Sequence, residues 1–158
     1  MNALEMFEHY LMDDYKRTKH FLNTSDSDFL EKISEKKALA IFHKAVKNTP
    51  AYEKFLNKNR LKFPQINSIK TINDFNKFVP ATEKDNYVKL YDFASRCKNG
   101  ELPIRGNIDE SSGTSGKATN WIHDIGEEDL LFKSVKFEYN YSFSNEKEDY
   151  LVISAWQK

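Results

Sequence analysis

The first hundred residues carry apolar side chains at helical spacing. Leu4, Phe7, Leu11 and Tyr15 recur every three or four residues, which predicts a helix with one apolar face. The same spacing between residues 29 and 46 predicts a long helix that ends before Pro50, because proline cannot continue a helix. Shorter stripes predict further helices, around residues 52–56, 71–78 and 82–91. We expect the chain up to residue 100 to be mainly helical.

Polar residues at the expected starts of these helices support this interpretation. In a capping box, a hydroxyl and a carboxylate three residues apart satisfy each other's backbone N–H groups. Three pairs have this spacing: Ser25 and Asp28, Thr71 and Asp74, and Thr82 and Asp85. We therefore expect Ser25, Thr71 and Thr82 to cap three helices.

The pattern changes after residue 100. Residues 102–108 and 118–123 are typical of strands, and residues 127–141 have the spacing of a helix. Residues 150–155 form a nearly continuous apolar run, which predicts a buried strand. These elements are typical of the start of an α/β region that lacks its remaining strands.

The predicted fold class is therefore α/β, with two portions. Residues 1–100 form a mainly helical N-terminal portion, and residues 101–158 form the start of an incomplete α/β domain. Because unpaired strand edges favour association, we expect a homo-oligomer.

Composition excludes several classes of function. The 24 basic and 24 acidic residues balance, so nothing predicts binding to nucleic acid or to an anionic membrane surface. The chain has one cysteine, Cys97, and no long apolar run, which predicts a cytoplasmic protein without a membrane span. The four histidines are scattered without metal-ligand spacing, so no metal site is predicted.

A short loop rich in glycine and hydroxyl groups is the candidate binding site. Glycine allows backbone N–H groups to turn toward an anion, while hydroxyls and an ammonium add donors for phosphate oxygens. The candidate phosphate-binding residues are Ser111, Ser112, Gly113, Thr114, Ser115, Gly116 and Lys117. The loop is not a Walker A motif, because only two residues separate its glycines and Ala118 follows the lysine. On composition alone, a polar turn without a ligand remains an alternative.

Three segments in order resemble adenylate-forming enzymes. Residues 42–52 contain the N-x-P-x-Y pattern, and residues 79–85 are similar to an L-P-x-T-x-K-x-D segment. Residues 110–119 resemble the ATP-phosphate signature S-S-G-T-[ST]-G-K-P-T, with Ala118 in place of the proline. The resemblance is to phenylacetate–CoA ligases and long-chain acyl-protein synthetases, and it covers residues 38–155.

This resemblance implies an ATP-dependent ligase that activates a carboxylic acid. ATP and Mg²⁺ are the implied cofactors, and coenzyme A is one possible acceptor of the acyl group. The implied substrate is a small carboxylic acid, and residues 111–117 are implied to hold the ATP phosphates. The magnesium ligand, the catalytic residues and the C-terminal lid of such enzymes match no residue here, so we expect an N-terminal fragment without activity of its own.

Two other classes of protein stay open. One is a non-catalytic protein that binds phosphate or nucleotide through the same loop. The other is a helical interaction protein in which the loop is only a connection.

Overall fold

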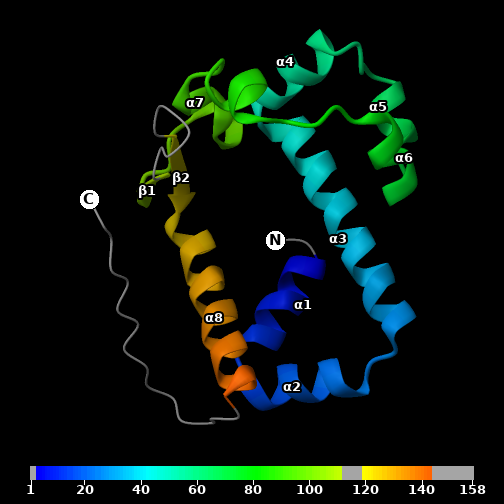
Figure 1. The fold of residues 1–158 in the computed structure, drawn as a ribbon, viewed down its shortest axis with the longest axis vertical. Helices are drawn as coiled ribbons and strands as arrows, with labels where there is room; N and C mark the ends of the chain where they lie inside the picture. The colour runs from blue at the N-terminus through cyan, green and yellow to red at the C-terminus, as the bar shows by residue number, and fades with distance from the viewer. Residues whose placement is uncertain (1–2, 112–118, 144–158) are drawn as a thin grey trace. The chain divides into compact units, whose positions relative to one another are not determined.

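The structure is a computed structural model that describes residues 3–111 and 119–143 (Figure 1). Its contacts divide the chain into two compact units. The central unit comprises the described residues between 25 and 128. The terminal unit combines residues 3–24 with residues 129–143. Each unit is described separately below.

The central unit begins with helices, as the apolar spacing predicts. Its helical segments are α3 (Ser27–Asn48), α4 (Pro50–Lys58), α5 (Gln65–Ser68), α6 (Ile72–Phe78), the π-helix η1 (Lys84–Val88), α7 (Phe93–Arg96) and the 3₁₀-helix η2 (Lys98–Gly100). The strands β1 (Gly106–Glu110) and β2 (Asn120–Asp124) follow, and α8 (Ile125–Ser142) continues from the central into the terminal unit. Thus helices precede residue 100 and the two strands follow it.

The core of the central unit lies among α3, α4, α5 and the residues around them. Its buried side chains are Phe42, Val46, Phe55, Leu56, Leu61, Ile66 and Ile69. Half-buried aromatic rings extend it, and the Phe42 and Phe75 rings meet edge to face with centroids 5.3 Å apart. This apolar cluster fixes α6 and η1 against α3 and α4.

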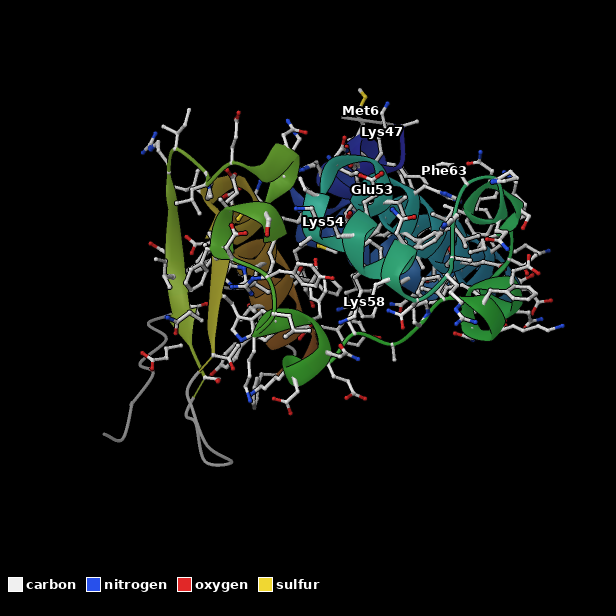
Figure 2. The ribbon with its side chains drawn as sticks, turned by 90° about the horizontal axis from the view of Figure 1, so that it is seen from above. Met6, Lys47, Glu53, Lys54, Lys58 and Phe63 are labelled. Carbon is white, nitrogen blue, oxygen red and sulfur yellow. The ribbon has the colours of Figure 1, made fainter. Side chains whose placement is uncertain are left out.

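Helix α4 shows how the apolar spacing separates the two faces of a helix. Phe55 and Leu56 are buried in the core. Glu53, Lys54 and Lys58 are exposed, and Figure 2 shows their side chains along the solvent face of the helix. Pro50 occupies the first turn of α4, where its missing N–H has no helical partner to lose.

One of the three predicted capping boxes is confirmed. At α6 the backbone N–H of Asp74 donates to Thr71 Oγ1 at 3.1 Å, and the N–H of Thr71 donates to Asp74 Oδ2 at 3.0 Å. The Thr71 hydroxyl also donates to Asp74 Oδ2 at 2.8 Å, and this bond, together with backbone N–H bonds from Lys70 and Thr71, lowers the pKa of Asp74.

The other two predicted caps are wrong by one residue. Helix α3 is capped by Asp26, whose carboxylate accepts the Asp28 N–H at 2.8 Å, and not by Ser25. At η1 the Glu83 N–H donates to Asn86 Oδ1 at 2.7 Å, so the start of this helix lies at Glu83 and not at Thr82. In each region several adjacent polar residues are capable of capping, and spacing alone does not choose between them.

The predicted first helix is two helices. Helix α1 (Ala3–Met12) ends before Tyr15, and α2 (Tyr15–Thr24) begins there. Asp14 separates them, and its carboxylate accepts the Arg17 N–H at 2.7 Å, which is a cap for the second helix. The apolar spacing continues across this break, so the spacing alone did not show where the first helix ends.

The two strands form an antiparallel hairpin. Gly106 pairs with Asp124 at one end and Glu110 pairs with Asn120 at the other. Both strands agree with the predicted regions 102–108 and 118–123, although β1 begins later and β2 ends one residue further on. The predicted strand at 150–155 lies outside the described residues. The described chain is therefore a mixed, helix-rich structure with a small antiparallel sheet.

Helix α8 confirms the predicted helix at 127–141. It begins two residues earlier, at Ile125, and continues to Ser142. None of the helices in the described part of the chain is both long and apolar enough to cross a lipid bilayer.

Candidate phosphate-binding hairpin

The open end of the hairpin carries the candidate loop. Beyond the last strand pair, the Ser111 N–H donates to the Thr119 carbonyl at 2.9 Å. The Thr119 N–H donates in return to Ser111 Oγ at 3.0 Å. These two bonds close the base of the loop between residues 111 and 119, and Thr119 is buried there with 5% of its surface exposed.

Of the predicted phosphate-binding residues, Ser111 lies within the described chain. Ser112, Gly113, Thr114, Ser115, Gly116 and Lys117 lie outside the described residues. Their role therefore stays a prediction, while the two strands that carry the loop are placed.

A lysine that sequence reasoning missed lies beside Ser111. The Lys84 ammonium donates to Ser111 Oγ at 3.4 Å, at the long end of the hydrogen-bond range, across 27 residues of sequence. Lys84 belongs to the segment at 79–85 that carries part of the resemblance, but spacing alone assigned it no role. The structure thus adds one cation to the base of the candidate loop.

The short π-helix η1 fixes the backbone of Lys84. Its defining bonds join residues five apart, such as the Lys89 N–H to the Lys84 carbonyl at 2.9 Å. Tyr87, in the same helix, packs its ring against Phe55 with centroids 5.5 Å apart. The apolar core therefore holds the element that positions Lys84.

Tyr52 of α4 and Tyr87 of η1 are structural groups. Burial, with a smaller contribution from Tyr87, raises the pKa of Tyr52 to about 12. Burial also raises the pKa of Tyr87. Their hydroxyls stay protonated at neutral pH, so neither is suited to act as a general base.

Two histidines of the central unit have partners in the structure. His43 Nε2 lies 3.1 Å from the Ile69 carbonyl, which ties α3 to the residue after α5. His123 Nε2 lies 3.3 Å from Asp109 Oδ2 on the facing strand. Among the described residues, no three His, Cys, Asp or Glu side chains gather as a metal site.

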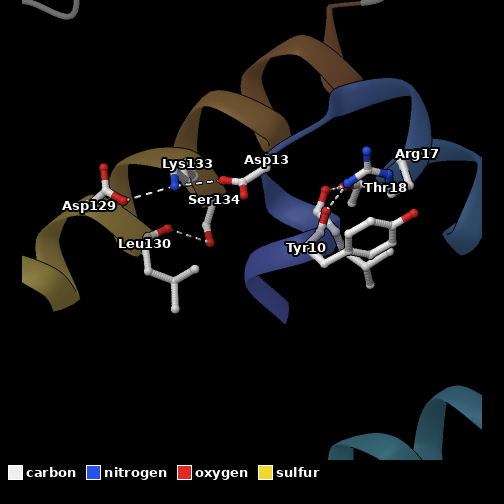
Figure 3. A network of polar contacts seen from close by, with 9 residues as sticks. Tyr10, Asp13, Arg17, Thr18, Asp129, Leu130, Lys133 and Ser134 are labelled. Carbon is white, nitrogen blue, oxygen red and sulfur yellow. Dashed lines mark hydrogen bonds and ion pairs between the residues drawn. The ribbon is translucent and has the colours of Figure 1, made fainter. Parts of the chain in front are cut away.

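The terminal unit has a separate cavity of about 440 Å³. It is lined by Met12, Asp13, Asp14, Tyr15, Lys16, Asp129, Phe132, Lys133, Lys136, Phe137 and Asn140. Figure 3 shows Lys133 between two carboxylates, with Nζ 2.8 Å from Asp13 Oδ1 and 3.0 Å from Asp129 Oδ2. These contacts lower the pKa of Asp13 and raise that of Lys133. The two carboxylates therefore offset the charge of the Lys133 ammonium.

Comparisons of the chain with protein-family models, with curated proteins and with solved structures gave no match. The assignment of function therefore depends on the residues and on the geometry of the hairpin.

Proposed function

We propose that this chain is the N-terminal part of an ATP-dependent ligase that activates a carboxylic acid, and that residues 111–117 hold the ATP phosphates. The observation that carries this proposal is the closed hairpin base with the Lys84 ammonium beside the Ser111 hydroxyl. A loop that is held at its base by two strands and supplied with a cation suits an anion better than a simple connection does. The order of the three resembling segments supports the same function.

The proposed reaction has two steps. The carboxylate attacks the α-phosphate of ATP, which forms an acyl-adenylate and releases pyrophosphate. A thiol, such as that of coenzyme A, then takes the acyl group and releases AMP. Charge on the departing pyrophosphate has to be offset, and hydroxyl, backbone N–H and ammonium groups of the loop are suited to that task.

The Ser111 hydroxyl and the Lys84 ammonium at the base of the loop suit phosphate. Hydroxyls and ammonium groups bind anions, whereas Mg²⁺ takes oxygen ligands such as carboxylates. Within residues 3–111 and 119–143, no cluster of acidic side chains has the arrangement of a metal site. We propose that the Mg²⁺ ligands, the catalytic residues and a lid belong to a longer enzyme, in which these strands join a larger α/β domain.

The test uses oligophosphate binding by the 158-residue chain. Trp121 on β2 is the reporter, and Trp156→Phe removes the second tryptophan of the sequence. We expect ATP and pyrophosphate to change the Trp121 fluorescence with saturation. Lys117→Ala should weaken the binding of both ligands by about tenfold, because a hydrogen bond to a charged group contributes roughly 1.5–3 kcal/mol.

The outcomes separate the proposed function from its alternatives. No response to either ligand would contradict phosphate binding and favour a helical interaction protein. In the longer ligase, Lys117→Ala should slow ATP–pyrophosphate exchange by about tenfold or more, and binding without exchange would favour a non-catalytic phosphate-binding protein. We expect the 158-residue chain alone not to release pyrophosphate from ATP in the presence of a carboxylic acid. Release of pyrophosphate would contradict the proposal that catalysis requires the longer enzyme.

A further inference from the structure

We infer that Lys84 is a second phosphate-binding cation of this site, which acts together with the Ser111 hydroxyl on an oligophosphate. The inference depends on the proposed function, because it extends the phosphate site from the loop to η1. It concerns two described residues that come from different elements and meet at the base of the hairpin.

The hydrogen bonds around Ser111 leave its hydroxyl hydrogen for a ligand. A serine oxygen accepts two hydrogen bonds through its lone pairs and donates one. At Ser111 the accepted bonds come from the Thr119 N–H, at 3.0 Å, and from the Lys84 ammonium, at 3.4 Å. Since both acceptor positions are occupied, the remaining interaction of Ser111 is donation, which suits an anion.

The charge of Lys84 is not offset by a carboxylate. Within the described residues, its one polar contact is with Ser111, and the ion pairs there involve other side chains. Asp85, the adjacent acid, pairs with Lys89, which caps the end of η1. An ammonium has three donors, so two of those on Lys84 are available to phosphate oxygens.

The fixed backbone of η1 prepares Lys84 for binding. The Asn86 side chain bridges the Glu83 N–H, at 2.7 Å, and the Ala81 carbonyl, at 3.1 Å. Tyr87 anchors the next turn in the core. Because the backbone at Lys84 is already held, ligand binding by this side chain costs less conformational entropy than it would for a lysine on a free loop.

The ligand class follows from the number of cations. The proposed function assigns one ammonium group, that of Lys117, to the phosphates, and Lys84 supplies another from a different segment of the sequence. Two ammonium groups supplied by separate segments suit a ligand with more than one phosphate group. We therefore expect Lys84 to contribute to the binding of ATP and pyrophosphate, and far less to that of inorganic phosphate.

The experiment compares the first residue of η1, Lys84, with the residue that caps its other end, Lys89. Lys84→Met, Lys84→Arg and the control Lys89→Met are prepared in the Trp156→Phe chain, and pyrophosphate, ATP and inorganic phosphate are titrated against Trp121 fluorescence at two salt concentrations. The control removes an equal charge from the other end of η1. Thermal unfolding followed by circular dichroism checks that each variant is folded.

We expect Lys84→Met to weaken the binding of pyrophosphate and of ATP by about tenfold and to reduce the salt dependence of that binding. Lys84→Arg should recover part of the affinity, since it keeps the charge, and Lys89→Met should bind as the unchanged chain does. Equal losses in Lys84→Met and Lys89→Met would overturn the inference, because general charge would then be the cause.

Failure of this inference differs from failure of the proposed function. If Lys117→Ala weakens binding and Lys84→Met does not, the loop binds phosphate and the role of Lys84 is overturned. If the unchanged chain binds neither ATP nor pyrophosphate, both proposals are overturned.

Discussion

Tyr52 shows how burial alters the chemistry of a single side chain. Its ring packs between Phe42 and Tyr87, with centroids 6.3 Å and 6.2 Å away. Removal from water disfavours the phenolate, which raises the pKa of Tyr52 to about 12. The folded state therefore holds this proton more tightly than the unfolded state does.

A pH dependence of stability follows from this shift. The contribution of Tyr52 to the free energy of unfolding is fully present below pH 10, which is about the pKa of the tyrosine in the unfolded chain. It is lost as the pH rises through about 12, the pKa of Tyr52 in the folded chain. We expect the urea midpoint of the central unit to fall over this range, and Tyr52→Phe to fall less steeply. Tyr91→Phe is the matched control for loss of one hydroxyl near the same core. Identical slopes for Tyr52→Phe and the unchanged chain would contradict the assignment.

Single residues also mark the limit of sequence reasoning at the site. The loop and Ser111 were found from glycine and hydroxyl composition, which is local information. The contact of Lys84 with Ser111 spans 27 residues and arises because the core holds η1 near the hairpin. No local pattern records such a contact, so Lys84 was found only from the structure.

At the scale of elements, the hairpin depends on a close backbone approach at Gly106. A Cβ atom built on Gly106 would lie 2.1 Å from the His123 carbonyl oxygen, which is too close for any side chain. The facing strand is backbone at that point, so it cannot move aside as a flexible side chain does. Glycine is therefore required for the pairing of β1 with β2.

We expect Gly106→Ala to disrupt the hairpin and Gly126→Ala to be tolerated. In the control, the new Cβ would meet a side-chain oxygen of Asp124 at 3.2 Å, which a small shift relieves. Amide hydrogen exchange at residues 107–110 and 120–123 measures the effect, and faster exchange is expected only in Gly106→Ala. Equal protection in both variants would show that the strands accommodate the added methyl group.

Elements were predicted where a pattern is strong and local. Helices α1, α3, α4, α6 and α8, the short helix η1 and the two strands lie where the sequence patterns predicted them, whereas α2, α5, α7 and η2 were not predicted. The break at Asp13 and Asp14 was missed because the apolar stripe continues through it, and the caps at Asp26 and Glu83 were missed because neighbouring polar residues compete. Boundaries depend on which hydrogen bonds form, which spacing does not specify.

At the scale of the whole molecule, the stability of the central unit depends on one buried cluster. Leu56 is completely buried in it, whereas Leu90 is 56% exposed. We expect Leu56→Ala to lower the free energy of unfolding by about 2–5 kcal/mol, because it removes buried methyl groups and leaves a cavity. Leu90→Ala, the same substitution at the surface, should cost about 0.5 kcal/mol or less. Urea denaturation followed by circular dichroism measures both, and similar losses would place Leu56 outside the core.

Local patterns do not show which segments make up the terminal unit. Helix-rich character and the change after residue 100 were read from the sequence. The terminal unit joins α1 and α2 to α8 through contacts such as the Asp13–Lys133 ion pair, which spans 120 residues. Such pairing depends on the complete fold, and the larger α/β domain remains a proposal.

The discontinuous terminal unit has a consequence for synthesis on the ribosome. Residues 3–24 are translated first, and their partners among residues 129–143 follow only after the whole central unit. At bacterial or eukaryotic elongation rates this delay is roughly 5 to 20 seconds. Throughout that interval the apolar faces of α1 and α2 lack their native neighbours, which exposes this segment to association with other unfolded chains.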